Sequence, residues 1–153
     1  SEVRMIVPGD LEDRVEPLIG APFQPHAQDP VTGWDCRGCA WWCLKAFCGV
    51  TAPDYRDLYD ASVVMSPSAR KNRARLIAEG LRAWRPVEPQ AGVVAWLEWL
   101  GGAGHVGFML GPSRVLHADL RAGTVVMDLD RPDAAYRLRG AFVPAQITDI
   151  VRV

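Results

Sequence analysis

The spacing of apolar residues divides the chain into a helical first half and a strand-rich second half. The stretch LEDRVEPLIGAPF (11–23) predicts a short helix ended by Gly20, which a polar loop follows. CRGCAWWCLKAF (36–47) then has helical periodicity and stops at Gly49, a residue type that favours the left-handed conformation after a helix. From Thr51 to about Pro86 the chain is basic, and its pattern is again helical.

The period changes after residue 92. Five short runs are rich in β-branched or aromatic residues and are separated by turn-forming residues. They are VVAWLEWL (93–100), HVGFMLG (105–111), SRVLHADL (113–120), GTVVMDLD (123–130) and YRLRGAFV (136–143). Helices followed by strands predict an α+β fold, in which N-terminal helices pack on a C-terminal antiparallel sheet or small barrel of about five strands.

Length and net charge limit the classes of function that the protein can have. A chain of 153 residues can bury a substantial core, so we expect residues 1–153 to form a single domain. The net charge of −1 gives no general attraction to nucleic acid or to an anionic membrane, so neither is an expected partner. The N-terminal stretch SEVRMIVPGDLEDR lacks the basic-then-apolar pattern of a signal peptide, so we expect synthesis in the cytoplasm without one.

The basic stretch RKNRARLIAEGLR (70–82) is the one segment that invites a nucleic-acid interpretation. Its apolar positions fit one buried helix face, so a solvated basic face is the simpler interpretation. A docking surface on a particle protein is the alternative.

Four cysteines lie within residues 36–48, at the spacing C-x2-C-x3-C-x4-C. A continuous helix cannot place four sulfur atoms around one tetrahedral metal ion, and zinc knuckles come as separated pairs on turns. We therefore expect Cys39, Cys43 and Cys48 to be reduced thiols packed in the core. A metal or iron–sulfur cluster on irregular backbone is the alternative; the simpler interpretation needs neither metal nor cofactor.

Cys36 differs from the other three by its position. Gly33 permits a sharp turn before it, and Asp35 can lie at or near the helix N-cap. A thiol in the first helical turn faces unpaired backbone N–H groups and the positive end of the helix dipole, and both stabilise the thiolate. Cys36 is therefore the candidate nucleophile.

A nucleophilic thiol needs a base, and the chain has three histidines. His105 and His117 lie in two predicted strands with Gly111 and Pro112 between them. A hairpin that turns there brings the two imidazoles near each other, so that one can act as base and the other can orient it. A lone strand histidine is more often structural or exposed, and His26 lies in a proline-rich loop where we expect it to be solvated.

Two motifs resemble those of the NlpC/P60 cysteine peptidases. DCRG (35–38) followed by an aromatic-rich helix is similar to the family's Asp-Cys-x-Gly motif, and HVGFMLGPSRVLHA (105–118) is similar to its histidine motif. VVAWLEWL falls where the family has the strand before its histidine. The stretch GAPFQPHAQDPVTGWDC (20–36), with APDY after the helix, is closer still to versions from tailed phages and related particles. The resemblance covers roughly residues 15–145.

The resemblance implies a papain-like α+β fold and hydrolysis of peptide bonds in peptidoglycan stem peptides, without a metal or organic cofactor. Cys36 would be the nucleophile, His105 the general base and His117 the polar third member. The Cys36 N–H and a nearby donor would form the oxyanion hole. In phage-type members the peptidase sits at the tail tip or baseplate, where it opens the cell wall during delivery. Tail-hub or baseplate proteins would then be partners.

Three further residues, Asp35, Arg37 and Phe23, are expected to line the substrate site. Phe23 stands near the place where the family often has a tyrosine, Arg37 replaces a common small residue, and Gly92 stands where many members have an aspartate. These departures leave open an altered substrate or a weak enzyme. The alternative function is a catalytically weak or inactive structural tail or baseplate module with the same fold.

Overall fold

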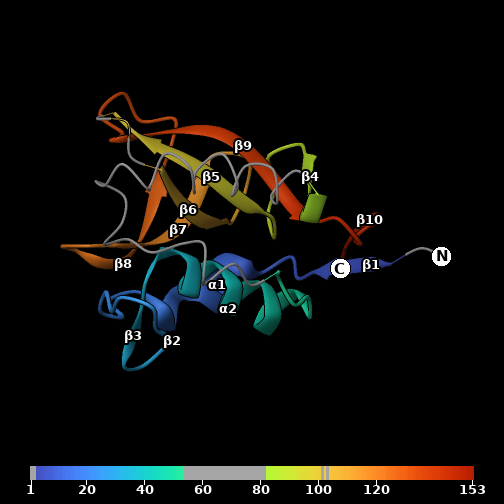
Figure 1. The fold of residues 1–153 in the computed structure, drawn as a ribbon, viewed down its shortest axis with the longest axis horizontal. Coiled ribbons are helices and arrows are strands. Elements are labelled where there is room, and N and C mark those ends of the chain that lie inside the picture. The colour runs from blue at the N-terminus through green and yellow to red at the C-terminus, as the bar shows by residue number, and fades with distance from the viewer. Residues whose placement is uncertain (1–2, 54–81, 101, 103) are drawn as a thin grey trace.

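A six-stranded antiparallel sheet and a layer of helices make up the fold (Figure 1). The computed structural model describes residues 3–53, 82–100, 102 and 104–153. In their order across the sheet, the strands are β4 (Trp84–Val87), β9 (Tyr136–Pro144), β5 (Val94–Trp99), β6 (Gly104–Met109), β7 (Arg114–Asp119) and β8 (Gly123–Asp128).

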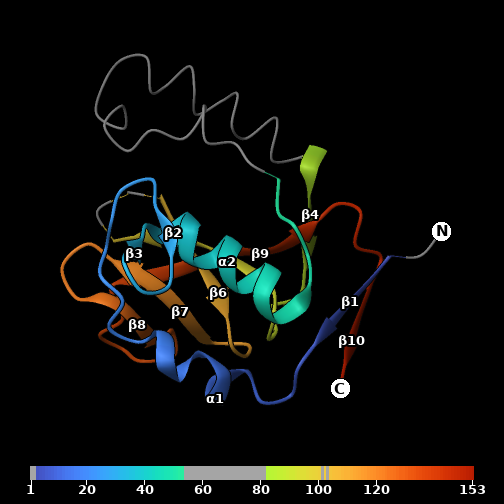
Figure 2. The same ribbon diagram turned by 90° about the horizontal axis from the view of Figure 1, so that it is seen from below.

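The helical layer contains α1 (Leu11–Val15), a 3-10 turn η1 (Glu16–Leu18) and α2 (Cys36–Cys48). Two short strands, β2 (Gln28–Asp29) and β3 (Gly33–Trp34), form the loop before α2. Near the chain ends, β1 (Arg4–Val7) pairs in parallel with β10 (Asp149–Arg152), as the two neighbouring arrows in Figure 2 show. The same view shows α2 lying across the sheet, where it packs on β6 and β7.

The α+β layout and the five predicted strands are confirmed, but the sheet is larger than expected. Its sixth strand, β4, falls where the helical segment was expected to continue to Pro86, so that prediction was wrong at its end. Pro86 fits here because β4 is an edge strand, where a residue without an N–H leaves no ladder bond unmade. Residues 54–81 of this expected helical segment, and with them the basic stretch 70–82 apart from its last residue, lie outside the described residues.

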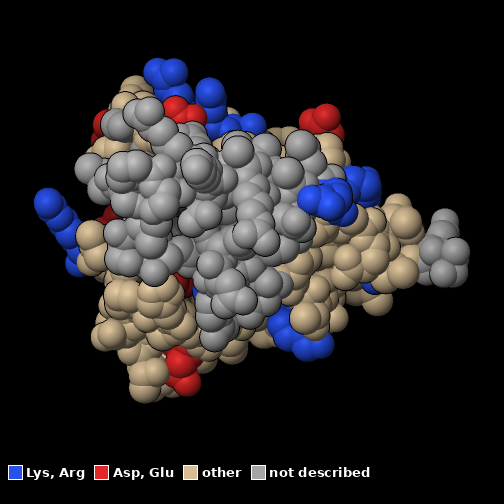
Figure 3. All heavy atoms as spheres, in the orientation of Figure 1, with Lys and Arg blue, Asp and Glu red and all other residues tan. Residues whose placement is uncertain are grey.

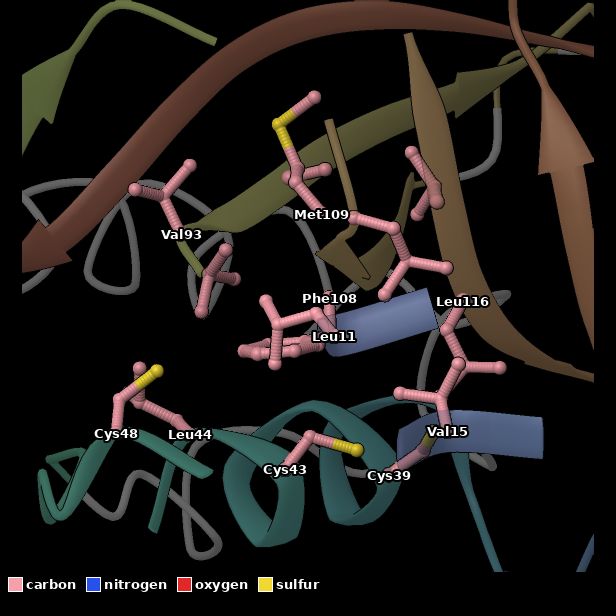
Figure 4. Packing of buried hydrophobic residues seen from close by; sticks show 14 of the residues in the cluster. Leu11, Val15, Cys39, Cys43, Leu44, Cys48, Val93, Phe108, Met109 and Leu116 are labelled. Atoms are coloured by element: carbon pink, nitrogen blue, oxygen red, sulfur yellow. The ribbon is translucent and has the colours of Figure 1, made fainter. Parts of the chain in front are cut away.

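The core lies between α2 and the sheet. Figure 4 shows Cys43 and Leu44 on the side of α2 that faces Phe108. Cys39 and Cys43 are fully buried and Cys48 is 8% exposed, so their predicted place in the core is confirmed. α2 ends at Gly49, whose φ of 69° is the left-handed conformation expected there.

A buried hydrogen-bond chain fastens the loop before α2 to the sheet. The Trp34 indole Nε1–H donates to Thr124 Oγ1 at 2.7 Å, and the Thr124 hydroxyl donates to the Ala21 carbonyl at 3.0 Å. Trp34 and Thr124 are both fully buried. Because Trp34 comes two residues before Cys36, this chain also fixes where the helix begins.

Replacing Thr124 with valine should therefore destabilise the protein. Val keeps the shape but leaves the Trp34 N–H buried without an acceptor, so we expect the free energy of unfolding to fall by about 1–3 kcal/mol in urea titrations. Thr124→Ser, which keeps the hydroxyl, is the control and should lose about 1 kcal/mol or less. Equal losses in the two variants would show that the hydroxyl contributes nothing.

Candidate active site

The start of α2 is held by Asp35, which is the N-cap of the helix. Its Oδ1 accepts the Gly38 N–H at 2.7 Å, and its Oδ2 accepts the His26 N–H at 3.0 Å. A Cβ at Gly38 would lie 2.1 Å from the Ala27 carbonyl oxygen, so only glycine lets the loop pass this close to the helix. Aspartate and glycine in the DCRG motif thus have a structural cause.

Cys36 is the first residue of α2 and is 4% exposed. This is the position at which the helix dipole and the first-turn N–H groups favour a thiolate. Two of the other thiols have raised pKa values. A hydrogen bond with Cys43, followed by burial, raises the pKa of Cys39 well above its usual value, and burial raises the pKa of Cys48 to about 11. These two stay protonated at neutral pH.

The β6–β7 hairpin brings the two strand histidines together, as its predicted turn requires. His105 Nε2 lies 2.8 Å from His117 Nδ1, and the two rings are nearly perpendicular, at 87°. Gly107 belongs to β6, and a Cβ there would come within 2.3 Å of Val115 Cγ1 on β7. His117 is buried, at 3% exposure, whereas His105 is partly exposed.

Both imidazoles are neutral at neutral pH. Burial, and after it the nearby His117, lower the pKa of His105 to about 3, whereas Asp119 opposes this shift. Burial also lowers the pKa of His117, against the same carboxylate. If His105 is to accept a proton at Nδ1, its Nε2–H must donate to His117 Nδ1, so His117 selects the useful tautomer.

Two residues near the histidines were missed by the sequence analysis. The Tyr136 ring stacks on His105, with centroids 4.9 Å apart and planes at 24°, and it meets His117 edge-on at 5.4 Å. Asp119 follows His117 on β7 and accepts N–H bonds from residues 121 and 122, which lower the pKa of its carboxyl. Neither residue belongs to a short sequence motif. The only sequence signal for Asp119 was strand alternation, which places it on the same face of β7 as His117.

Burial is the main cause that raises the pKa of Tyr136, and the charges of Asp119 and Cys36 raise it further. Tyr136 therefore lies within electrostatic reach of both the thiol and the carboxylate. Cys36 thus acts electrostatically on the tyrosine that stacks on His105.

The three expected substrate-site residues occupy different places. Both carboxylate oxygens of Asp35 accept hydrogen bonds from backbone N–H groups. Arg37 follows Cys36 and is buried, at 6% exposure, and Phe23 is partly buried beside Trp34. Contact of any of the three with a substrate stays a prediction.

The described residues give little support for a site of another kind. No group of three or more His, Cys, Asp or Glu side chains there is placed to hold a metal ion, and no helix there is long and apolar enough to cross a membrane. On the face in Figure 3, the described Lys and Arg side chains are scattered around the rim. A cavity of about 280 Å³ lies by the start of α1 and is lined by none of the histidine-site residues.

Comparison with solved structures finds the same fold in a Staphylococcus aureus protein described as similar to a lipoprotein of the NLP/P60 family. The TM-score is 0.52 and the identity 21%; the match covers 86% of this chain and 39% of that chain. This chain thus corresponds to less than half of that protein. No family model matches the sequence, and no curated protein does. The likeness supports the NlpC/P60-like α+β fold that the motifs predicted.

The histidine pair should make stability depend on pH. The unfolded chain binds protons at histidine near pH 6.5, whereas folded His105 binds one only near pH 3. The contribution of neutral His105 to the free energy of unfolding is therefore complete above pH 6.5 and declines as the pH falls toward 3, by up to about 1.4 kcal/mol per unit.

The measurement is chemical denaturation at several pH values, with His105→Gln beside the wild type. Most other titrating groups are common to both proteins and cancel in the difference. We expect the stability of the wild type relative to the variant to decrease as the pH falls below 6.5. A difference that does not change with pH would contradict the depressed pKa.

Proposed function

We propose that this protein is an NlpC/P60-type cysteine peptidase that hydrolyses peptide bonds in the stem peptides of peptidoglycan. The observation that supports it most is the hydrogen-bonded pair of His105 and His117 on a hairpin against which the Cys36 helix packs. The shared fold with the S. aureus protein and the two sequence motifs add to this support.

In the proposed reaction the Cys36 sulfur attacks the carbonyl carbon while His105 Nδ1 takes the thiol proton. The His105 Nε2–H donates to His117, which keeps the ring oriented as it becomes positive. The Cys36 backbone N–H, at the start of α2, stabilises the developing oxyanion. His105 then gives its proton to the leaving amine, and water, deprotonated by His105, hydrolyses the thioester and regenerates the thiol.

The finer part of the proposal is delivery. We place the protein in a phage-like tail tip or baseplate, made in the cytoplasm and carried to the cell wall on the particle, with hub or baseplate proteins as partners. This rests on the likeness of residues 20–36 to phage-type sequences. An inactive structural module is the alternative, but burying two hydrogen-bonded imidazoles costs stability, and a module without chemistry has no need of them.

Replacing Cys36 with alanine should abolish activity and leave the fold intact. The test is digestion of purified peptidoglycan sacculi, with the released fragments weighed by mass spectrometry. Cys48→Ala is the matched control, because it removes a protonated thiol from the other end of the same helix and should retain activity. The masses of the fragments would also identify the bond that is cut.

Release that persists in Cys36→Ala would show that another group is the nucleophile. If the wild type releases nothing from any wall type, titration of Cys36 with a thiol reagent decides the matter. A thiol pKa at or above about 8.5 would then favour the inactive module.

His117 should affect turnover through its acceptor atom. His117→Ala leaves the Nε2–H of His105 without its partner, so we expect kcat to fall by about 100-fold, the low end of what a positioned base contributes. His117→Asn offers an amide oxygen to the same N–H and should recover about tenfold of that loss. Equal rates for the two variants would show that His117 acts only by packing.

A further inference from the structure

We propose that Tyr136 is a positioning residue for His105, and that its aromatic ring fixes the plane of the His105 imidazole. The inference rests on the proposed function, since the orientation of His105 matters to turnover only if that imidazole takes a proton. Tyr136 lies on β9, whereas His105 lies on β6, so two non-adjacent strands build this contact.

A base needs its ring fixed in two respects, in direction and in plane. The 2.8 Å contact with His117 fixes the direction of His105 Nε2, but the ring could still rotate about that line. The stacked Tyr136 ring, at 4.9 Å and 24°, blocks this rotation, because a turned imidazole would collide with the phenol face. The two contacts together determine where Nδ1 points.

Tyr136 is itself held in place by a second aromatic ring. Trp99 is its register partner on β5, and the two rings meet edge-to-face at 5.1 Å and 73°. Trp99 is 44% exposed, so a row of aromatic rings runs from buried His117 to the surface. Such contacts add to the packing energy and restrict the tyrosine to one rotamer.

The ring also keeps water from His105. Burial is the first cause that lowers the pKa of His105, and Tyr136 covers one face of that imidazole. Among the described residues the Tyr136 hydroxyl makes no hydrogen bond, so the ring itself carries the effect. Phenylalanine at position 136 should therefore preserve the position and the pKa of His105, whereas an aliphatic side chain should not.

The first measurement is an NMR titration of the imidazoles in the wild type, Tyr136→Phe and Tyr136→Leu. The chain has three histidines, so each can be assigned by substitution. We expect leucine to raise the pKa of His105 by about one unit, because the exposed ring gains hydration, and phenylalanine to leave it unchanged. Arg137→Gln, an exposed neighbour on the same strand, is the matched control. Tyr136→Met serves if the leucine variant does not fold.

The second measurement is the rate on soluble muropeptides prepared from sacculi with a muramidase. We expect Tyr136→Leu to lower kcat about tenfold, with little change in KM. The acid limb of the pH profile of kcat/KM should move to higher pH, because the pKa of His105 is raised. Tyr136→Phe and Arg137→Gln should stay close to the wild type.

An unchanged His105 pKa in Tyr136→Leu, or an unchanged kcat, would overturn the proposal. So would an equal loss in Tyr136→Phe, which would assign the effect to the hydroxyl. A wild type without turnover would reject the proposed function instead, and the NMR titration would still decide whether the ring encloses His105.

Discussion

The carboxylate of Asp35 is the constraint on which the site depends. One of its oxygens caps α2 through Gly38 and the other holds the loop at His26, so a single side chain joins the loop to the first helical turn. The residue before it, Trp34, is anchored in the sheet through Thr124, and the residue after it is the candidate nucleophile. Of three consecutive residues, Trp34 thus anchors the loop, Asp35 caps the helix and Cys36 carries the thiol. A shift in any of them would move Cys36 relative to the histidines.

The sheet provides the other half of the site through non-local contacts. The two histidines are on adjacent strands whose close approach depends on the missing side chain of Gly107. Tyr136 reaches the same place from β9, with β5 between that strand and β6. Because the imidazoles are buried and neutral, they weaken the folded state in acid, yet the same burial keeps a lone pair on His105, which the proposed reaction needs. Stability and chemistry therefore favour opposite environments for this pair.

The parts that were predictable from sequence carry their signal within one short segment. Helical periodicity and Gly49 located α2, alternating runs located β5 to β9, and the turn between β6 and β7 was enough to pair the histidines. Several of the missed parts are long-range. β1 and β10 are four residues each and meet only because opposite ends of the chain come together. β4 follows a helical pattern and is a strand because it pairs with β9. Tyr136 reaches His105 through the order of strands, which periodicity does not encode.

The four cysteines show how position on one helix separates thiols of the same chemistry. On the interior face, a hydrogen bond with Cys43 and then burial raise the pKa of Cys39, and burial raises the pKa of Cys48. Cys36 is also nearly buried, but it lies where first-turn N–H groups and the helix dipole oppose that cost. Its place at the start of the helix is therefore what distinguishes Cys36 from the other three. The spacing that resembles a metal cluster thus combines one position at the start of the helix with three positions in the core.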